Sequence, residues 1–474
     1  MRKECLGRRP SAPRSSLRHL GILLLGLPIS CLAADKPAEA GLQASIVRGS
    51  YLATAADCAA CHRTPGANTP SFAGGLGMEL PFGRIVASNI TPSVSAGIGN
   101  YSEQDFVRAL TLGRRRNGSW LYPAMPYPAY AGLQPADLHD LYNYFMHGVA
   151  PDDQTPAKGW MAFPYSVRRG LALWNALFAR QQEPPPTTGE SATLRRGRYL
   201  VDVLGHCGSC HTPHNIAMAE EHSHYLQGGH VDGWMAPDIT SDPVRGLGDW
   251  SQDEIVSYLR DGHATGKAMA AGGMAEAVEN SLHALTHADL GAIATYLQHV
   301  PGRGHAGHEP PAWAYAGDPK ADRRPALAEG REIYARACAS CHRLAGEGAY
   351  GDWFPALSHN STVGAPAATN LIQVILHGID RASGPVRVHM PGFAGSLDNR
   401  RIAALTTYVR ARFGRETGPV TTDEVATARR GGLPVGLRAM LITGPWLGLL
   451  VLLGLIWTTV RRWQRRHAAN RSSS

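Results

Sequence analysis

The stretch "ATAADCAACHRTPG", residues 53–66, places two cysteines three positions apart and a histidine directly after the second. Positions i and i+3 of a helix lie on the same face, so Cys58 and Cys61 present both sulfurs to one group. A Cys-x-x-Cys-His run is the signature of c-type haem attachment, in which each thiol forms a thioether with a haem vinyl group and the histidine binds the iron. The stretch therefore predicts a haem c held by Cys58, Cys61 and His62.

The same pattern occurs twice more along the chain. Its further copies are Cys207, Cys210 and His211 in "GHCGSCHTPH", and Cys338, Cys341 and His342 in "RACASCHRLA". A single copy is also compatible with half a zinc site, a redox dithiol or a disulfide. Paired zinc knuckles usually lie within about twenty residues of each other, whereas these motifs are far apart. Three copies with the adjacent histidine favour three covalently bound haem c groups.

The N-terminal segment, residues 1–33, reads as a signal peptide. Six basic residues precede the short apolar run "GILLLGLPIS", residues 21–30, and small residues follow it, which places cleavage near Ala33/Ala34. The apolar run is shorter than the roughly 18 residues that a membrane span needs. The two cysteines outside the motifs, Cys5 and Cys31, both lie in this segment, and acylation of Cys31 in a lipoprotein is the alternative. Either reading predicts an exported protein.

The C-terminus carries a second apolar run. Ala439–Val460 is 22 residues long without a charge and is followed by five arginines in residues 461–474. At about 1.5 Å per residue its length is sufficient for a bilayer core, and the arginines favour the cytoplasmic side. We therefore expect a transmembrane helix over residues 439–460 and a cytoplasmic tail over 461–474. The alternative is an amphipathic helix that lies in the membrane interface.

The net charge of +8 comes from the two ends of the chain. Residues 1–33 and 461–474 each contribute +5, which leaves −2 for the body between them. A basic chain suggests nucleic acid or an anionic surface as partner, but only where the charge lies on the folded body. Nucleic-acid binding is therefore not expected.

Between the two ends the chain reads as three copies of one unit. Each copy opens with a glycine and an aromatic residue before its cysteines, and each closes with a segment whose apolar residues fall at i, i+3, i+6 and i+7. The closing segments are 138–145, 290–297 and 402–409. Proline-rich linkers separate the copies, which predicts domains over residues 34–180, 192–300 and 326–416. Few strand signals occur, so we expect an all-α fold in which haem completes three small cores.

Each iron needs a second axial ligand, and a methionine opposite the histidine is a common choice. Met125 and Met274 each lie 63 residues after their motif histidine, just before the closing helix of two aligned repeats. Met390 is the one methionine between the third motif and its closing helix, 48 residues after His342. The predicted ligand pairs are His62/Met125, His211/Met274 and His342/Met390.

Histidine is the competing ligand. Bis-histidine ligation remains the alternative, especially in the second and third units, where several histidines lie near the methionines: His263, His283, His287, His377 and His389. The carbonyl groups of Pro65 and Pro213, close after two of the motif histidines, are candidate partners for the other ring nitrogen.

Further motifs carry a family resemblance over roughly residues 45–415. They are "FAGG" (72–75), "PFGRIVASNITP" (81–92), "LYPAMPYPAY" (121–130) and "GGMAEAVENSL" (272–282). With three haem motifs after a signal peptide, the chain resembles the trihaem cytochrome c subunits of membrane-bound periplasmic dehydrogenases, such as gluconate 2-dehydrogenase and quinoprotein alcohol dehydrogenases. The resemblance implies three tandem class I cytochrome c-type domains. It also implies a catalytic partner subunit, dependent on flavin, pyrroloquinoline quinone or molybdopterin, and ubiquinone as acceptor.

These observations together predict a membrane-anchored electron carrier with no catalytic residues of its own. It would link a periplasmic sugar, alcohol or aldehyde dehydrogenase to ubiquinone or the respiratory chain, at the bacterial inner membrane with the haem domains in the periplasm. The alternatives are a haem enzyme with an open coordination position, either peroxidase-like or thiosulfate-oxidising, and a haem subunit of a terminal oxidase.

Overall fold

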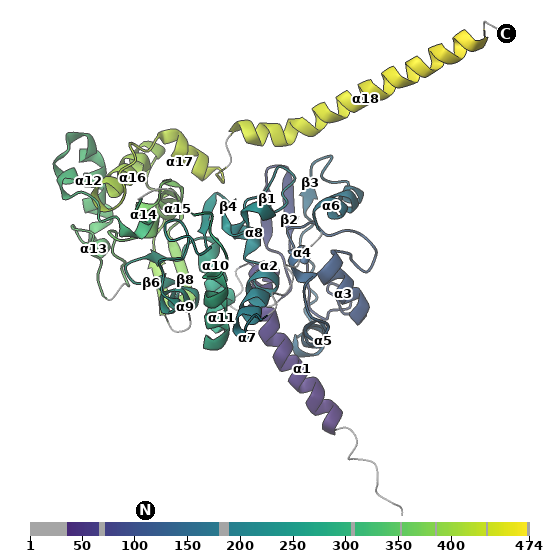
Figure 1. The fold of residues 1–474 in the computed structure, drawn as a ribbon, viewed down its shortest axis with the longest axis horizontal. Coiled ribbons are helices and arrows are strands. Elements are labelled where there is room, and N and C mark those ends of the chain that lie inside the picture. Colours follow the sequence, from purple (N-terminus) through teal and green to yellow (C-terminus); the bar gives the residue numbers. More distant parts are fainter. Residues whose placement is uncertain are drawn as a thin grey trace, which may run out of the picture. The chain divides into compact units, whose positions relative to one another are not determined.

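Each repeat is organised around a crossing between its first helix and the closing helical segment that contains residues 138–145, 290–297 or 402–409 (Figure 1). A glycine lies at each crossing, because a side chain would collide with the backbone of the other helix. A Cβ atom at Gly49 would lie 2.0 Å from the carbonyl oxygen of Asp140, and one at Gly197 would lie 2.0 Å from that of Ala292. Gly330 repeats the arrangement in domain 3. The glycine shared by the three repeats therefore allows the helices to approach closely.

The computed structural model describes residues 36–65, 72–179, 189–304, 309–350, 353–383, 386–432 and 435–471. The predicted signal peptide, with Cys5 and Cys31, lies outside the described residues. The chain divides into two compact units at residue 43, and the description below concerns the larger unit, which begins at Ala44.

Domain 1 consists of short helices and one small sheet. Its elements are α1 (Lys36–Ala55), α2 (Cys58–His62), β1 (Gly77–Leu80), β2 (Gly83–Val86), α3 (Glu103–Leu112), α4 (Tyr127–Tyr130), α5 (Pro135–Asn143), η1 (Tyr144–Gly148), β3 (Trp160–Met161), η2 (Arg168–Gly170) and α6 (Leu171–Phe178). The strands form one antiparallel sheet in the order β1-β2-β3.

Like domain 1, domain 2 has a first helix, a motif turn, a two-stranded hairpin and a closing helix. It contains α7 (Ala192–Arg198), η3 (Tyr199–Leu204), α8 (Gly208–His211), η4 (His222–His224), β4 (Gln227–Val231), β5 (Trp234–Asp238), α9 (Gln252–Asp261), β6 (His263–Ala264), β7 (Ala268–Met269), α10 (Gly273–Asn280), η5 (Leu282–Ala284) and α11 (His287–Leu297). Strands β4–β5 and β6–β7 form two separate hairpins.

Domain 3 follows three short 3-10 turns: η6 (Ala312–Ala314), η7 (Pro319–Arg323) and η8 (Pro325–Leu327). It contains α12 (Ala328–Ala337), α13 (Ala339–His342), α14 (Ser361–Gly364), α15 (Thr369–His377), β8 (Ile379–Ser383), β9 (Val386–Met390) and α16 (Asn399–Phe413). Two helices follow, α17 (Thr422–Arg429) and α18 (Val435–Arg471).

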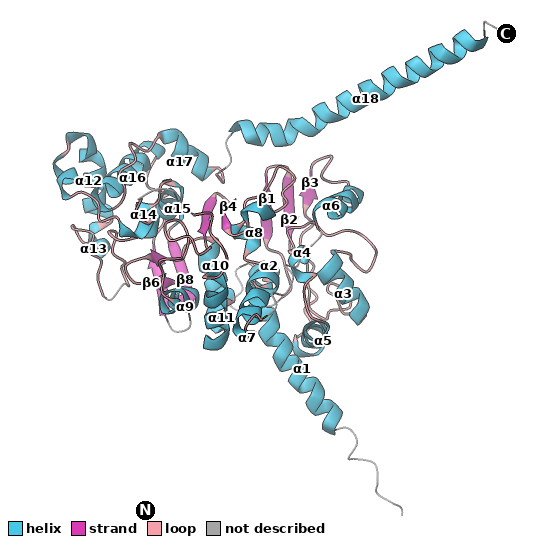
Figure 2. Cartoon of the chain, in the orientation of Figure 1, coloured by secondary structure: helices cyan, strands magenta, loops and turns pink. Residues whose placement is uncertain are grey.

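The hairpins overturn the prediction of an all-α fold (Figure 2). Each of their strands in the described residues has only two to five residues and no long alternating apolar pattern, so periodicity does not reveal them. The signal lies in a turn instead. Asp232 and Gly233 connect β4 and β5 with φ values of 49° and 80°, and an Asp-Gly pair is favoured in a two-residue hairpin turn of this kind.

Domains 1 and 2 share one hydrophobic core, whereas domain 3 has its own. The first core includes the apolar stripes of both closing helices, represented by Leu141, Phe145 and Ile293. The second core contains Leu405 and Phe413 of α16. The periodic stripes predicted from the sequence therefore face the cores.

A reciprocal exchange of hydrogen bonds joins domains 1 and 2. The hydroxyl of Tyr51 donates to Asp289 Oδ2 at 2.6 Å, and the hydroxyl of Tyr199 donates to Asp137 Oδ2 at 2.5 Å. Each tyrosine lies two residues after the crossing glycine of its own domain. Tyr199 is one residue further from its cysteines than Tyr51, and the π-helical turn η3 accommodates the additional residue.

Domain 3 attaches to domain 2 through backbone groups. The side chain of Asn370 pairs with both the N–H and the carbonyl of Met235, each at 2.8 Å. Ser361 donates twice to the carbonyl oxygen of Lys267, from its N–H and its hydroxyl, both at 2.7 Å. Buried Arg381 donates to the carbonyl of Asp261, next to the helix-ending Gly262.

The C-terminal helix α18 corrects a further prediction. It has 37 residues and takes in the apolar run 439–460 together with arginines after it. Within the described residues no helix combines the length and the apolar character that a membrane crossing requires. The prediction of a transmembrane helix over residues 439–460 is therefore wrong.

Candidate haem centres

Each Cys-x-x-Cys-His motif forms a short helical turn directly after the first helix of its domain: α2, α8 and α13. In domains 1 and 2 the residue before the first cysteine has positive φ, 51° at Asp57 and 37° at His206, which turns the chain sharply. All six motif cysteines are free thiols. Each turn therefore offers two sulfurs and an imidazole to one group.

Burial keeps five of the six motif thiols protonated. It raises the pKa of Cys58 and Cys207 to about 12, and that of Cys61, Cys210 and Cys338 to about 11. Reactive or metal-binding cysteines lie in electropositive surroundings that favour the thiolate. The surroundings here are apolar, which suits a macrocycle attached through sulfur.

A backbone carbonyl orients each motif histidine through Nδ1. His62 pairs with Ser88 at 2.6 Å, His211 with Pro237 at 2.7 Å and His342 with Pro355 at 2.9 Å. Burial lowers the pKa of all three rings, so they are neutral near pH 7. Nδ1 then carries the proton, and Nε2 has its lone pair free for a metal.

The carbonyl partners differ from those predicted. Pro65 and Pro213 do not bind the histidines; Ser88 and Pro237 do. The latter begin "SNITP" (88–92) and "PDITS" (237–241), and in each segment the second residue accepts from the N–H and hydroxyl of the fourth. Such a side-chain turn fixes the carbonyl just before it. The likeness of these two segments was the sequence signal for this role.

The three predicted methionine ligands lie in three different kinds of element. Met125 lies in the loop before α4, Met274 is the second residue of α10, and Met390 ends β9. Met125 and Met274 are partly buried against the first core, as are Cys58 and Cys207. Axial ligation by the three methionines stays a prediction. Of the competing histidines, His389 is exposed and 3.9 Å from Asp380, whereas His283 bonds the carbonyl of Val278 at 2.9 Å.

The first two centres lie side by side. Arg63, directly after His62, forms an ion pair with Glu276, two residues after Met274. The Cys61 thiol also contributes to the raised pKa of Cys210, after burial and two nearby carboxylates. A group held in α2 and one held in α8 are therefore neighbours.

These residues fit haem c. Paired free thiols, a neutral imidazole with Nε2 available and apolar surroundings meet its requirements in all three domains. Haem c supplies one-electron transfer when bound. The two cysteines of each motif would attach it, and the motif histidine, oriented by its carbonyl partner, would bind its iron.

Comparison with known proteins agrees with the assignment of haem c to these motifs. The cytochrome c family matches residues 327–412. The chain is 39% identical over 472 residues to the fructose dehydrogenase cytochrome subunit of Gluconobacter japonicus, covering 94% of this chain and 96% of that one. It is 37% identical over 424 residues to the cytochrome c subunit of alcohol dehydrogenase (quinone) of Gluconacetobacter polyoxogenes, covering 86% and 88%.

The gluconate 2-dehydrogenase cytochrome c subunit of Pantoea cypripedii is 37% identical over 430 residues, covering 87% of this chain and 94% of that one. The family resemblance predicted from the motifs is thus confirmed. The chain belongs to the family of cytochrome c subunits of dehydrogenases.

Proposed function

We propose that this chain is a trihaem electron carrier that accepts electrons from a catalytic dehydrogenase subunit and passes them to ubiquinone or another respiratory-chain acceptor. The observation that carries the proposal is the threefold repetition of one centre. Each copy has two thiols and a histidine oriented by a carbonyl. One haem c in each copy gives three redox groups in a single chain.

The adjacency of the first two centres supports transfer between them. Arg63 of the first and Glu276 of the second are 3.6 Å apart, so electrons pass between neighbouring groups without a diffusing partner. Domain 3 attaches to domain 2 through the backbone carbonyls of Lys267 and Asp261. Domain 2 is accordingly the middle of the chain of transfer.

The donor is a separate catalytic subunit. The relatives are named for fructose, alcohol and gluconate dehydrogenases, so a sugar, alcohol or aldehyde is the class of substrate proposed for the complex. A flavin, quinoprotein or molybdopterin enzyme each fits this role. The predicted signal peptide supports export, and we place the protein at the periplasmic face of the bacterial inner membrane.

The test is production of the chain with and without the catalytic subunit encoded beside it. We expect three covalent haems by mass, reduction by substrate only when the catalytic subunit is present, and no carbon monoxide binding by the native reduced chain. Strong carbon monoxide binding by one native haem, together with peroxide turnover by the isolated chain, would establish the haem-enzyme alternative instead.

A further inference from the structure

Domains 1 and 2 carry the same hairpin just before their predicted methionine ligands. Residues 97–125 align without a gap to 246–274, as the paired turns and helices of the two segments show. In domain 1 the hairpin is closed by a bridge between Arg114 and Trp120, and in domain 2 by pairing of His263 with Met269. The two hairpins therefore occupy equivalent positions beside equivalent centres.

In domain 2 this hairpin is a docking surface for another haem domain. The backbone carbonyl oxygen of Lys267 in this hairpin accepts two hydrogen bonds from Ser361 of domain 3, each at 2.7 Å. The ammonium of Lys267 also lies 4.5 Å from the centre of the Trp313 ring, in the linker before domain 3. The third centre thus joins the second through the hairpin that precedes Met274.

In domain 1 the equivalent hairpin is open. Gly118 stands where domain 2 has Lys267, and a Cβ atom there would meet no atom within 4 Å. The neighbouring Arg116 side chain is 56% exposed. Nothing in the described part of the chain covers this turn as domain 3 covers its counterpart.

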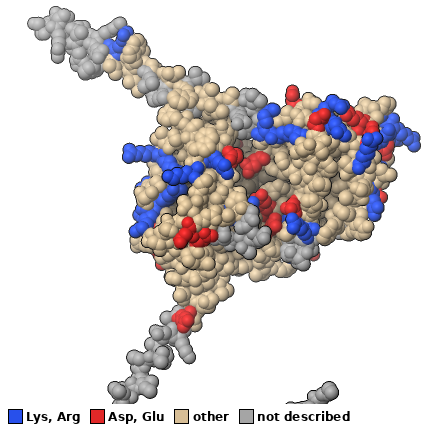
Figure 3. Space-filling view, turned by 180° about the vertical axis from the view of Figure 1, so that it is seen from behind, with Lys and Arg blue, Asp and Glu red and all other residues tan. Residues whose placement is uncertain are grey.

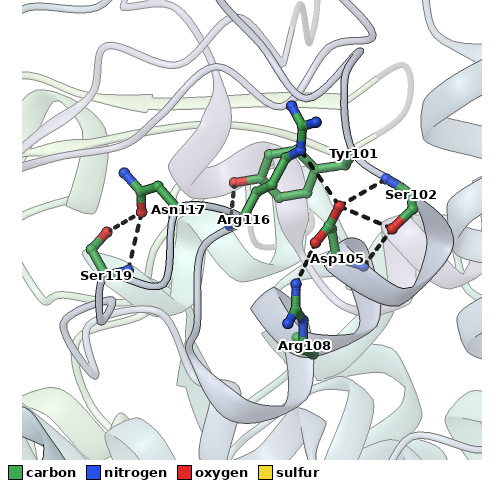
Figure 4. A network of polar contacts seen from close by, with 7 residues as sticks. All are labelled: Tyr101, Ser102, Asp105, Arg108, Arg116, Asn117 and Ser119. Atoms are coloured by element: carbon green, nitrogen blue, oxygen red, sulfur yellow. Dashed lines mark hydrogen bonds and ion pairs between the residues drawn. The ribbon is translucent and has the colours of Figure 1, made fainter.

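Polar contacts hold the open hairpin in a defined shape (Figure 4). The N–H of Arg116 donates to the hydroxyl of Tyr101 at 3.5 Å, and its guanidinium lies 3.7 Å from Asp105. The side chain of Asn117 accepts from the N–H and hydroxyl of Ser119, at 3.0 and 2.7 Å. The surface is therefore ordered before any partner arrives.

Arginines on aromatic rings cover this hairpin. The guanidinium of Arg114 lies 4.3 Å from the centre of the Trp120 ring, and that of Arg168 lies 4.3 Å from the centre of Tyr122. Arg168 also donates to the carbonyl of Trp120 at 2.6 Å. We call Arg114, Arg115, Arg116 and Arg168 the arginine surface; Figure 3 shows basic side chains gathered toward the end of the molecule where α3 and α6 lie.

The charge of the arginine surface is largely unneutralised. Among the described residues, Arg114, Arg115 and Arg168 have no carboxylate partner, and Arg116 shares Asp105 with Arg108. After burial, the charge of Arg168 is what most lowers the pKa of Arg115, so these groups repel each other. The equivalents of Arg115 and Arg116 in domain 2 are the uncharged Ala264 and Thr265. The one cation of the domain 2 hairpin, Lys267, is paired with Glu254 at 2.8 Å, so unpaired positive charge distinguishes the open copy.

We propose that the arginine surface docks a separate redox protein with an acidic face, in the place that domain 3 takes on domain 2. The inference rests on the proposed function, because it requires an electron-transferring haem in domain 1. The backbone carbonyl oxygen of Tyr122 accepts a hydrogen bond from the N–H of Met125 at 3.1 Å. A partner seated here therefore lies one turn from the predicted ligand. Carboxylates on the partner would neutralise the arginines and steer its approach.

The experiment uses the full trihaem chain and reduced flavodoxin, a small acidic flavoprotein, as the probe. The second-order rate constant for haem reduction is measured by stopped flow over a range of ionic strength. We expect R114E/R116E to be at least about tenfold slower at low salt and to lose most of its salt dependence. The matched control is R336E/R387E, which makes the same charge change at two domain 3 side chains, 78% and 71% exposed.

Equal rate constants for R114E/R116E and R336E/R387E would overturn the docking proposal. Reduction by durohydroquinone, an uncharged small molecule, separates this from failure of the proposed function. If durohydroquinone reduces three haems in every variant, the carrier function is supported whether or not the docking proposal holds. Fewer than three reducible haems in the native chain would contradict the carrier function instead. With the catalytic subunit present, slowing of substrate-driven reduction in R114E/R116E identifies the donor as the occupant, and slowing of reoxidation alone identifies a protein acceptor.

Discussion

Arg63 Nη2 lies 3.6 Å from Glu276 Oε1, and this pair joins the residue after the motif histidine of domain 1 to the helix that carries Met274, the predicted ligand of domain 2. Both side chains are partly exposed, so the pair adds little to stability. Its importance is positional, because it shows that residues 213 apart in the sequence bring two centres together.

Removing one pair of cysteines is expected to remove one haem. The variant C207A/C210A has no thiol to form a thioether in domain 2, so mass spectrometry is expected to show two covalent haems in place of three. The control S209A changes a residue in the same turn that is not a predicted attachment point, and it is expected to keep three. Three haems in C207A/C210A would contradict the assignment.

Replacing a predicted axial methionine is expected to change the iron without releasing the haem. M274L removes the sulfur ligand, so we expect a lower reduction potential for one haem, loss of its sulfur-to-iron charge-transfer band and new carbon monoxide binding. M125L and M390L are expected to act in the same way on the other two haems. M269L, in the nearby strand β7, is the control. Unchanged spectra and potentials in M274L would favour a histidine ligand.

The tyrosines at the junction of domains 1 and 2 are expected to stabilise the pair. Each donates to a carboxylate, and loss of such a bond costs about 1.5–3 kcal/mol. Urea unfolding of Y51F and Y199F is expected to show destabilisation of this size. Y350F changes an exposed tyrosine whose hydroxyl has no hydrogen-bond partner among the residues that the structure describes, and it is expected to unfold like the native chain. Native stability in both junction variants would mean that the shared apolar core alone holds the domains.

Asp202 is expected to make stability depend on pH. Burial raises the pKa of this carboxyl from 3.8 to about 6, although the hydroxyl of Tyr296 donates to it at 2.9 Å. The folded chain therefore keeps a proton that the unfolded chain releases, and stability falls as pH rises from about 4 to about 6. The two-unit shift corresponds to roughly 3 kcal/mol.

The comparison variant for this effect is D202N, which cannot ionise. The difference in unfolding free energy between the native chain and D202N is expected to decline from pH 4 to 6.5 and then stay constant. Other titrating groups cancel in this difference. A difference that is constant from pH 4 to 7 would show that Asp202 does not have the raised pKa.

The sequence predicted the parts of this molecule that depend on short-range pattern. The haem-attachment turns, the apolar stripes of α5, α11 and α16 and the crossing glycines follow from local spacing. The carbonyl partners of the histidines could not be predicted from local spacing. Ser88 lies 26 residues from His62, and it reaches the histidine only because the intervening chain folds back toward the motif. The β4–β5 hairpin was missed because its Asp232-Gly233 turn, not periodicity, specifies it.

The prediction for the C-terminal helix failed for a different reason. The run 439–460 was read as a span because its length matched a bilayer core and arginines follow it, yet no helix among the described residues has the length and apolar character of a membrane crossing. Length alone does not decide how an apolar helix is used.

The exchange between Tyr51 and Asp289 and between Tyr199 and Asp137 has a consequence for symmetry. Because each half contacts the other with the same face, domains 1 and 2 are related like the subunits of an isologous homodimer fused into one polypeptide. Such a contact closes on itself and leaves no copy of that face for a third member. Domain 3 has Glu332 where the tyrosine would be, two residues after its crossing glycine, and it binds the pair by a heterologous contact. The architecture is thus a closed dimer with one appended unit, and not the start of an open array.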